Sequence, residues 1–151
     1  PAGETAASGY GYRIAREYYD MDGAPLSPAE VTIGTRMVAV LTVTPADDSG
    51  ARLMVNDPLP AGFAIDNPNL LNAGDVAALD WLDPAFAEHA EFRSERFMAA
   101  VDWQSERPFT LAYIVRAVSP GSFHHPAALV EDMYRPEYRA TTASGRVTVS
   151  G

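Results

Sequence analysis

The residues that could carry chemistry are few, and most lie near the end of the chain. Two adjacent histidines, His124 and His125, could bind a metal ion or act as bases. Neighbouring residues on a strand point to opposite faces, so both rings could reach one ion only if the backbone bent, which Pro126 could cause. Since no third ligand stands at a recognisable spacing, the pattern favours surface or turn histidines over a metal site.

Paired acidic residues form the second group of candidates. Glu131 and Asp132 could act as a catalytic carboxylate pair, but strand alternation separates their side chains, and no partner base or nucleophile motif accompanies them. Asp20, Asp22 and Asp47–Asp48 could bind calcium, yet they lack the spaced Asp-x-Asp-x-Asp-Gly loop. We therefore interpret the first pair as structural acids near a strand end and the others as solvated turns.

The overall composition argues against several classes of function. The net charge is -9 and all 11 basic residues are arginine, which argues against nucleic acid and against direct contact of this domain with an anionic membrane. The absence of cysteine excludes a disulfide framework, a thiol nucleophile and a thiolate metal site. The sequence also lacks Gly-x-Ser-x-Gly, His-Glu-x-x-His and phosphate-loop motifs. It therefore predicts neither an enzyme nor a cofactor or metal site.

These exclusions leave one unusual feature, a loop in the tail segment 122–139. An apolar strand, Ala127–Val130, runs into a loop that carries Met133 and Tyr134, and Pro136 keeps that loop out of helical geometry. Large apolar side chains normally retreat into the core, so this loop is either pinned to its own domain or covers something else. A tyrosine near a β-sandwich strand end often bonds back to its own backbone as a tyrosine corner. The residues alone favour the pinned tyrosine corner and leave the covering role open as the alternative.

The elements around this loop read as seven or eight strands. The strongest, Arg36–Val43, is nearly all apolar and β-branched, which predicts a central strand buried on both faces. Asp20–Gly23, Asp47–Gly50 and Ser94–Glu95 read as turns between strands. The pattern is typical of an all-β fold, an antiparallel β-sandwich of immunoglobulin or fibronectin type. The other expected strands cover residues 10–19, 51–55, 90–93, 96–103, 109–118, 127–133 and 146–149, and residues 63–65 are a candidate for a further short strand.

One short helix is expected over Gly74–Leu82, where Asp75 can cap the first turn and Pro84 ends the helix. Trp81 would pin this helix to the sandwich, and Trp103 would lie in the core. Aromatic rings can also stack on a sugar, so the alternative function is a carbohydrate-binding or adhesive β-sandwich module. That alternative depends on Trp81, Tyr10, Tyr12, Tyr18 and Tyr19.

The length of 151 residues suits one globular domain. Pro1–Ser8 is small and polar and is expected to be a disordered or linker segment, which leaves residues 9–151 as a single domain. The chain begins Pro-Ala-Gly-Glu without an initiator methionine or a signal peptide. We interpret it as a domain cut from a longer protein or as a processed product.

Three blocks of sequence resemble a known family. They are Val55–Pro68, then Glu91–Ala100, and finally Phe109–Val118 running on to Val130–Pro136. In this order and with similar gaps, they resemble the C-terminal domain of bacterial alpha-2-macroglobulins, over most of the chain. The Glu-Asp-Met-Tyr-Arg-Pro block is the most specific of them.

The resemblance implies a non-enzymatic role in a protease-trapping inhibitor. Members of the family carry an internal Cys–Gln thioester in a separate domain, and the terminal domain packs on that domain and shields the bond. A Met-Tyr pair at the position of Met133 and Tyr134 acts as the lock. We expect Glu131, Asp132, Arg135 and Pro136 to support the lock loop, the first three by hydrogen bonds or ion pairs.

The resemblance also implies partners and a location. The partners would be the thioester domain of the same full-length protein and, through that protein, target proteases. The location would be the periplasm, with the full-length protein anchored to the inner membrane as a lipoprotein. The equivalent domain of animal relatives binds a receptor through helix lysines, and this chain has no lysine, so receptor uptake of that kind is not expected.

Overall fold

The fold is an all-β sandwich. The computed structural model describes residues 6–46, 51–67, 69–71, 79, 82 and 87–151. Among these residues it contains thirteen strands and no α-helix, and no helix that could cross a membrane. The strands are β1 (Ser8–Tyr10), β2 (Tyr12–Tyr19), β3 (Glu30–Thr32), β4 (Arg36–Pro45), β5 (Ala51–Pro58), β6 (Phe63–Asn67), β7 (Ala87–Phe92), β8 (Arg96–Trp103), β9 (Phe109–Ala117), β10 (Gly121–His125), β11 (Leu129–Asp132), β12 (Arg139–Thr141) and β13 (Gly145–Ser150).

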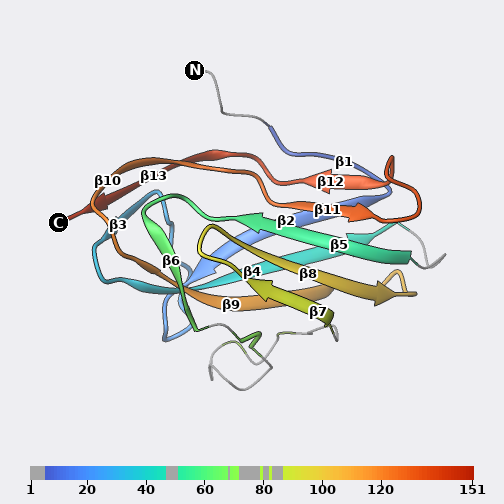
Figure 1. Ribbon diagram of the computed structural model, residues 1–151, viewed down its shortest axis with the longest axis horizontal. Coiled ribbons are helices and arrows are strands. Elements are labelled where there is room, and N and C mark those ends of the chain that lie inside the picture. The colour runs from blue at the N-terminus through green and yellow to red at the C-terminus, as the bar shows by residue number, and fades with distance from the viewer. Residues whose placement is uncertain (1–5, 47–50, 68, 72–78, 80–81, 83–86) are drawn as a thin grey trace.

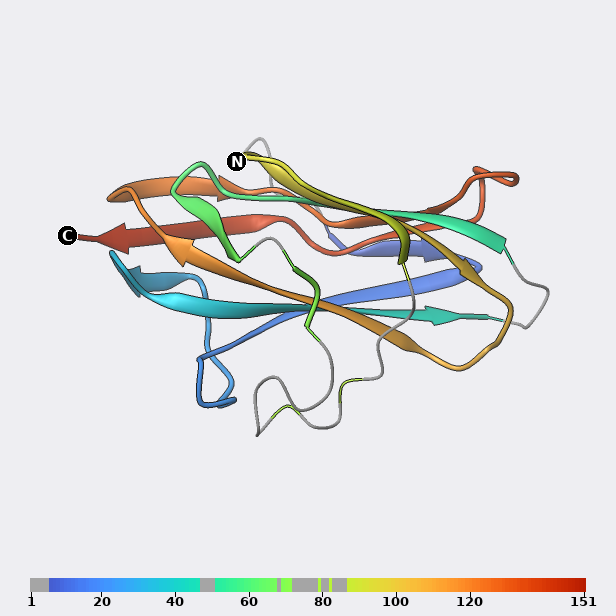
Figure 2. The same cartoon turned by 60° about the horizontal axis from the view of Figure 1, so that its bottom comes forward.

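The strands form two facing layers (Figures 1 and 2). One layer is a six-stranded sheet with the order β1-β12-β11-β5-β8-β7, and the other contains a four-stranded sheet with the order β2-β4-β9-β6. A three-stranded sheet, β10-β13-β3, lies at the end where the chain terminates. Neighbouring strands are antiparallel except β13 and β3, which are parallel. The predicted antiparallel sandwich is confirmed.

The core lies between the layers and is built by alternating side chains. β4 pairs with β2 on one side and β9 on the other, and Met37–Leu41 is fully buried on both faces. Its inward residues join the main core, where the rings of Phe97 and Tyr113 stack with centroids 4.6 Å apart. Its outward residues pack against Leu71, Leu79 and Leu82. The prediction of a central strand buried on both faces is therefore confirmed.

The predicted number of strands was too small, because four strands were missed. β1, β3 and β12 have three residues each, so they are too short to show a period of two, and β10 has five residues of which only Phe123 is a large apolar one. The predicted strand over residues 51–55 was too short, since β5 continues through Pro58, which lies opposite Arg96 of β8. The predicted turn at Asp47–Gly50 lies outside the described residues. So does the predicted helix over Gly74–Leu82, apart from Leu79 and Leu82.

Candidate functional site

The β11–β12 loop, Met133–Tyr138, joins two neighbouring strands of the six-stranded sheet. It protrudes at the end of the sandwich opposite the C-terminus (Figures 1 and 2). Its strands are fixed in register, since Val130 lies opposite both Val55 of β5 and Ala140 of β12. The loop therefore rises from a firmly paired part of the sheet.

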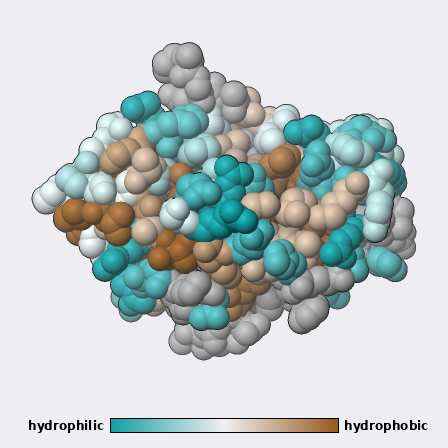
Figure 3. Space-filling view, in the orientation of Figure 1, coloured by the Kyte–Doolittle hydropathy of each residue, from teal (hydrophilic) through white to brown (hydrophobic). Residues whose placement is uncertain are grey.

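The loop exposes two large apolar side chains. Met133 is 36% exposed and Tyr134 is 77% exposed. Among the described residues, only Tyr10 and Ile33 are other large hydrophobic side chains exposed to a comparable degree. Elsewhere hydrophilic and hydrophobic residues are interspersed, as Figure 3 shows for one face. An exposure this high contradicts the tyrosine-corner interpretation, because a corner tyrosine folds back onto its own domain.

Asp132, the last residue of β11, organises the backbone of the loop. Its carboxylate is buried, and its Oδ1 accepts hydrogen bonds from the amides of Tyr134 and Arg135 at 2.9 and 3.1 Å. Its Oδ2 accepts from Arg135 Nε at 3.0 Å. The Met133 amide donates to the carbonyl of Arg52 at 2.9 Å. Because every one of these bonds involves backbone or a buried acceptor, the tyrosine ring is presented from an ordered base.

The second half of the loop closes as a turn around Pro136. The Tyr138 amide donates to the Arg135 carbonyl at 2.8 Å, so Pro136 occupies the position where its fixed φ favours a turn. The Arg135 guanidinium lies over the Tyr138 ring at 4.1 Å from the centroid. The ion pair between Glu131 and Arg139 is long, at 3.8 Å, and lies on a partly exposed surface. Asp132 and Arg135 therefore contribute more to the loop geometry than Glu131 does.

A buried polar network lies between the layers, away from this loop. The Arg16 guanidinium, with a side chain only 5% exposed, donates to the Asp57 carboxylate at 2.6 Å and to the Pro126 carbonyl at 2.8 Å. The Tyr113 hydroxyl donates to the other oxygen of Asp57. Burial raises the pKa of Asp57, and Arg16 and Tyr113 oppose that rise. This network ties β2, β5 and β9 together across the core.

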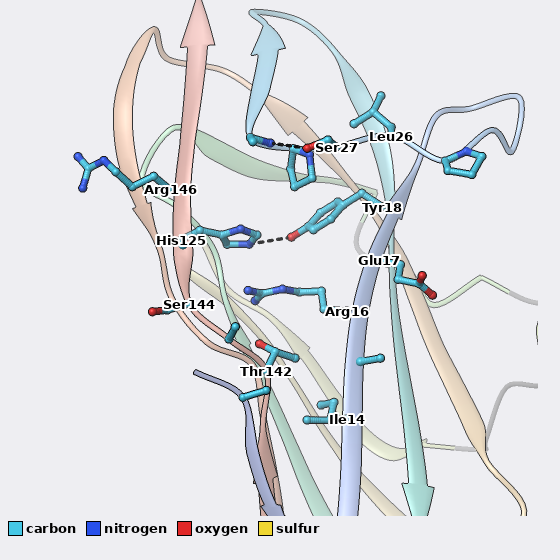
Figure 4. A pocket seen from close by; sticks show the side chains of 17 residues that line it. Ile14, Arg16, Glu17, Tyr18, Leu26, Ser27, His125, Thr142, Ser144 and Arg146 are labelled. Atoms are coloured by element: carbon cyan, nitrogen blue, oxygen red, sulfur yellow. Dashed lines mark hydrogen bonds between the residues drawn. The ribbon is translucent and has the colours of Figure 1, made fainter. Parts of the chain in front are cut away.

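His125 extends this polar arrangement, because its Nε2 lies 3.0 Å from the Tyr18 hydroxyl. Figure 4 shows Arg16 and Tyr18 pointing from β2 toward His125, at the floor of a groove of about 700 Å³. Burial, together with the charges of Arg16 and His124, lowers the pKa of His125 from its usual 6.5 to about 3. The imidazole is therefore neutral at pH 7, and it serves as a partner for Tyr18.

This burial makes stability depend on pH. Between pH 6.5 and 3 the unfolded chain binds a proton at residue 125 that the folded chain does not, so stability falls as the pH falls. We expect His125 to cost about 2 kcal/mol of unfolding free energy between pH 7 and pH 5. Urea denaturation of the parent chain and of His125→Gln at both pH values measures this cost as a difference. The two chains must be compared because the raised pKa of Asp57 makes the unfolding free energy fall as the pH rises, which is opposite to the effect of His125.

His124→Gln is the matched control for that measurement, because the neighbouring ring is exposed. His124→Gln is expected to retain most of the change in unfolding free energy that the parent chain shows between the two pH values. An equal change in the parent chain and in His125→Gln would contradict the assignment of this pH dependence to His125.

The remaining sequence candidates lie apart from one another. His124 and His125 point to opposite faces of β10, as alternation requires, but His125 is buried, so its prediction as a surface or turn residue was wrong. Asp20 accepts hydrogen bonds from the amides of Asp22 and Ala24, which makes this segment the predicted turn. Within the described residues no three His, Asp or Glu side chains gather as metal ligands.

Sequence reasoning missed the Arg16–Asp57–Tyr113 network, although a signal was present. Arg16 falls on the same face of β2 as Ile14 and Tyr18, which are core residues. An arginine at an inward position needs a buried anion, and Asp57 lies within a strand rather than in a turn. The pairing of these two residues across separate sheets could not be read from the sequence.

Comparison with known proteins shows which family this fold and loop belong to. Residues 11–137 match the family described as Bacterial Alpha-2-macroglobulin MG10 domain. The chain belongs to this family. The match includes β2 through β11 and the β11–β12 loop as far as Glu137. The resemblance stated from the sequence is thereby confirmed for bacterial alpha-2-macroglobulins, while its assignment to the C-terminal domain stays a prediction.

Individual relatives of this MG10 domain agree with the match. The chain is 36% identical to an alpha-2-macroglobulin of Xylella fastidiosa over 146 residues, covering 90% of this chain and 9% of the relative. It is 37% identical to the Escherichia coli alpha-2-macroglobulin over 141 residues, covering 87% of this chain and 8% of the relative. The chain thus spans about a tenth of the length of the curated relatives it matches.

Solved structures extend the likeness to three dimensions. The structure of Salmonella alpha-2-macroglobulin reacted with methylamine superposes with a TM-score of 0.85 at 33% identity, covering all of this chain and 10% of that one. The native conformation of the Escherichia coli protein gives a TM-score of 0.86 at 30% identity, again covering all of this chain and 10% of that one.

Proposed function

We propose that this MG10 domain packs against the thioester domain of a full-length alpha-2-macroglobulin and shields the thioester with Met133 and Tyr134. The full-length protein would be a protease-trapping inhibitor in which this domain is C-terminal. The observation that carries the proposal is a tyrosine 77% exposed on a loop whose backbone is otherwise tied down. An aromatic ring that is costly to expose, carried on a backbone that is already ordered, is well suited to cover a partner surface.

The chemistry of a thioester explains why such a cover is needed. Its carbonyl carbon reacts with water and with amines, so it must stay dry until the protein is triggered. An aromatic ring and a polarisable thioether exclude water and adapt to an irregular surface. Because the base of the loop is ordered by Asp132, little conformational entropy is lost on packing. The loop nonetheless lies at the end of the sandwich, from which a partner domain can separate.

We extend the proposal to the surroundings of the full-length protein. It would lie in the periplasm, anchored to the inner membrane as a lipoprotein, and meet target proteases there. Two relatives are themselves connected with a protease or an amine. One Escherichia coli structure is of the protein activated by porcine elastase, and the Salmonella structure is of the protein reacted with methylamine.

The alternative, a carbohydrate-binding or adhesive module, has less support from the geometry. Of the aromatic residues on which it depends, Tyr12 and Tyr18 are buried, and Tyr18 is committed to His125. Tyr10 is exposed but its ring packs edge-on against Tyr138. Trp81 lies outside the described residues. Tyr19 is half-buried and packs against the core cluster that contains Val38 and Val40. The described tyrosines therefore do not form a flat exposed platform on which a sugar ring could stack.

Replacement of Tyr134 tests the proposed function. In the full-length protein, Tyr134→Ala should raise the rate of thioester cleavage by methylamine roughly tenfold or more, since the loss of a buried aromatic anchor costs about 2 kcal/mol or more. Methylamine attacks the thioester carbonyl, forms an amide and releases the cysteine thiol, so titration of free thiol follows the reaction. Tyr134→Phe retains the ring and should react close to the parent rate.

The matched control is Ile33→Ala, which truncates an exposed apolar side chain at the far end of the domain. Ile33 is 40% exposed, and its amide donates to Ser150 near the C-terminus. It should leave the methylamine rate unchanged. If Tyr134→Ala reacts no faster than Ile33→Ala, the shielding role is wrong.

A further inference from the structure

A continuous set of contacts runs from the first strand of the domain to the tyrosine on the loop. The ring of Tyr10 in β1 packs edge-on against Tyr138, with centroids 5.0 Å apart. Tyr138 in turn lies under the guanidinium of Arg135, which donates to Asp132. Asp132 accepts the amide hydrogen of Tyr134 at 2.9 Å. Each step is a direct contact, so the position of β1 bears on the position of Tyr134.

Tyr138 is the residue in which these contacts meet. Its amide and its carbonyl both bond within the loop, to the Arg135 carbonyl at 2.8 Å and to the Asp132 amide at 3.0 Å. Tyr10 raises the pKa of Tyr138 through its charge and a side-chain hydrogen bond. A Cβ atom on Gly11 would lie 2.4 Å from the Tyr138 ring, so the backbone of residue 11 is pressed against that ring. Tyr138 therefore has β1 on one side and the loop on the other.

β1 itself is weakly held. It has three residues, all exposed, and it lies at the edge of the six-stranded sheet, where β12 is the one described strand that pairs with it. Beyond this ladder, the Ser8 and Thr141 hydroxyls lie 3.0 Å apart. A three-residue edge strand opens at low cost compared with the core strands.

Gly11 gives β1 a hinge. Its φ of 77° is a conformation that favours glycine, and at this residue the chain passes from the six-stranded sheet to β2 in the four-stranded sheet. β2 is anchored by eight paired residues along β4. A pull on the residues before Ser8 would therefore separate β1 from β12 while β2 stays in place.

We propose that β1 is a latch for the β11–β12 loop, with Tyr138 as the positioning residue that transmits its state to Tyr134. With β1 paired, Tyr10 and Gly11 confine Tyr138, Tyr138 supports Arg135, and the Tyr134 ring is held in one orientation. With β1 detached, Tyr138 loses the Tyr10 ring, while Gly11 stays in place because its carbonyl accepts the amide hydrogen of Ala46 at 2.9 Å, and the loop loosens. The latch is a mechanism for releasing the shield described above, and in that respect it rests on the proposed function.

Amide exchange in the 151-residue chain tests the latch without any thioester. Hydrogen exchange at the Tyr134 and Arg135 amides, followed by NMR, reports the opening of their bonds to Asp132. Tyr138→Ala is expected to raise exchange at both amides about tenfold, equivalent to about 1.4 kcal/mol. Tyr10→Ala, a change at an edge residue that leaves the core intact, is expected to raise it about threefold. Tyr138→Phe keeps the ring but loses the hydrogen bond to Tyr10, so it should raise exchange less than Tyr138→Ala does, and Ile33→Ala should leave it at the parent rate.

A disulfide that fixes β1 on β12 tests the latch by strengthening the pairing instead of weakening it. Ser8→Cys/Thr141→Cys places two sulfur atoms where the hydroxyl groups now face each other, in a chain that has no other cysteine. Oxidation fixes β1 on β12 and is expected to slow exchange at the Tyr134 amide below the parent rate, whereas the reduced form exchanges at about the parent rate. If exchange at Tyr134 is the same in Tyr10→Ala, in the oxidised pair and in the parent, the latch is wrong.

The full-length protein then separates this proposal from the proposed function. Tyr10→Ala should raise the methylamine rate in the same direction as Tyr134→Ala but by a smaller factor, and Tyr10→Ala/Tyr134→Ala should react no faster than Tyr134→Ala alone. A double variant that multiplies the two effects would contradict the latch, since β1 would then act independently of Tyr134. If Tyr134→Ala has no effect, the shielding role fails, while the exchange experiments still decide whether β1 controls the loop.

Discussion

Replacing Arg16 with methionine is expected to lower the free energy of unfolding of this chain by about 3–5 kcal/mol at pH 7. Arg16 is the only cation within bonding distance of the Asp57 carboxylate among the described residues, and the two side chains are 5% and 0% exposed. Without it, Asp57 must either keep a buried, unpaired charge or take up a proton. Both outcomes cost free energy that the unfolded chain does not pay. Urea denaturation followed by tryptophan fluorescence measures the change.

A second variant shows whether the cost comes from the lone charge. In Arg16→Met/Asp57→Asn both charges are gone, and the amide oxygen of residue 57 can still accept the Tyr113 hydroxyl. This double variant should lose less stability than Arg16→Met alone, because a buried ion pair replaced as a pair is often close to neutral. Arg13→Met, on the exposed face of the same strand, should change stability by less than about 0.5 kcal/mol. A double variant less stable than Arg16→Met would contradict the unpaired-charge explanation.

The fold was predictable where long periodic segments specify it. Arg36–Val43 was recognised as a central strand because its apolar run requires burial on both faces, and the hairpin at Ser94–Glu95 was recognised from its flanking strands. The strands β1, β3 and β12 were missed because three residues carry no readable period. Their pairing depends on tertiary neighbours, for instance Thr148 of β13, which lies opposite Glu30 of β3.

The candidate site was predictable in part, because two of its residues break the usual pattern of burial. Met133 and Tyr134 stood out because apolar residues beside a proline turn conflict with the rule that such residues are buried. The sequence could not show that Asp132, and not Glu131, orders the loop. The two acids are alike in type and differ only in which face of β11 they occupy. His125 was misjudged because its burial depends on Tyr18, a residue more than a hundred positions away.

Removing the Asp132 carboxylate should have a large effect on both stability and shielding. In Asp132→Ala the amides of Tyr134 and Arg135 and the Arg135 guanidinium lose a common, buried acceptor. Hydrogen bonds to a charged group contribute about 1.5–3 kcal/mol each, and since these three share one carboxylate and are partly open to water, we expect a total loss of about 3 kcal/mol. Urea denaturation of the 151-residue chain measures this loss.

Asp132→Ala leaves the Tyr134 side chain intact but should no longer hold it in one orientation. In the full-length protein Asp132→Ala is therefore expected to raise the methylamine rate almost as much as Tyr134→Ala, because an unordered ring must lose conformational freedom before it can pack on a partner. Glu131→Ala is the matched control: it removes a neighbouring acid whose ion pair with Arg139 is long and partly exposed, and should change stability by less than about 1 kcal/mol. If Asp132→Ala lowers stability as expected but leaves the methylamine rate at the Glu131→Ala level, the order of the loop base is not needed for shielding, and contact by the tyrosine ring alone accounts for it.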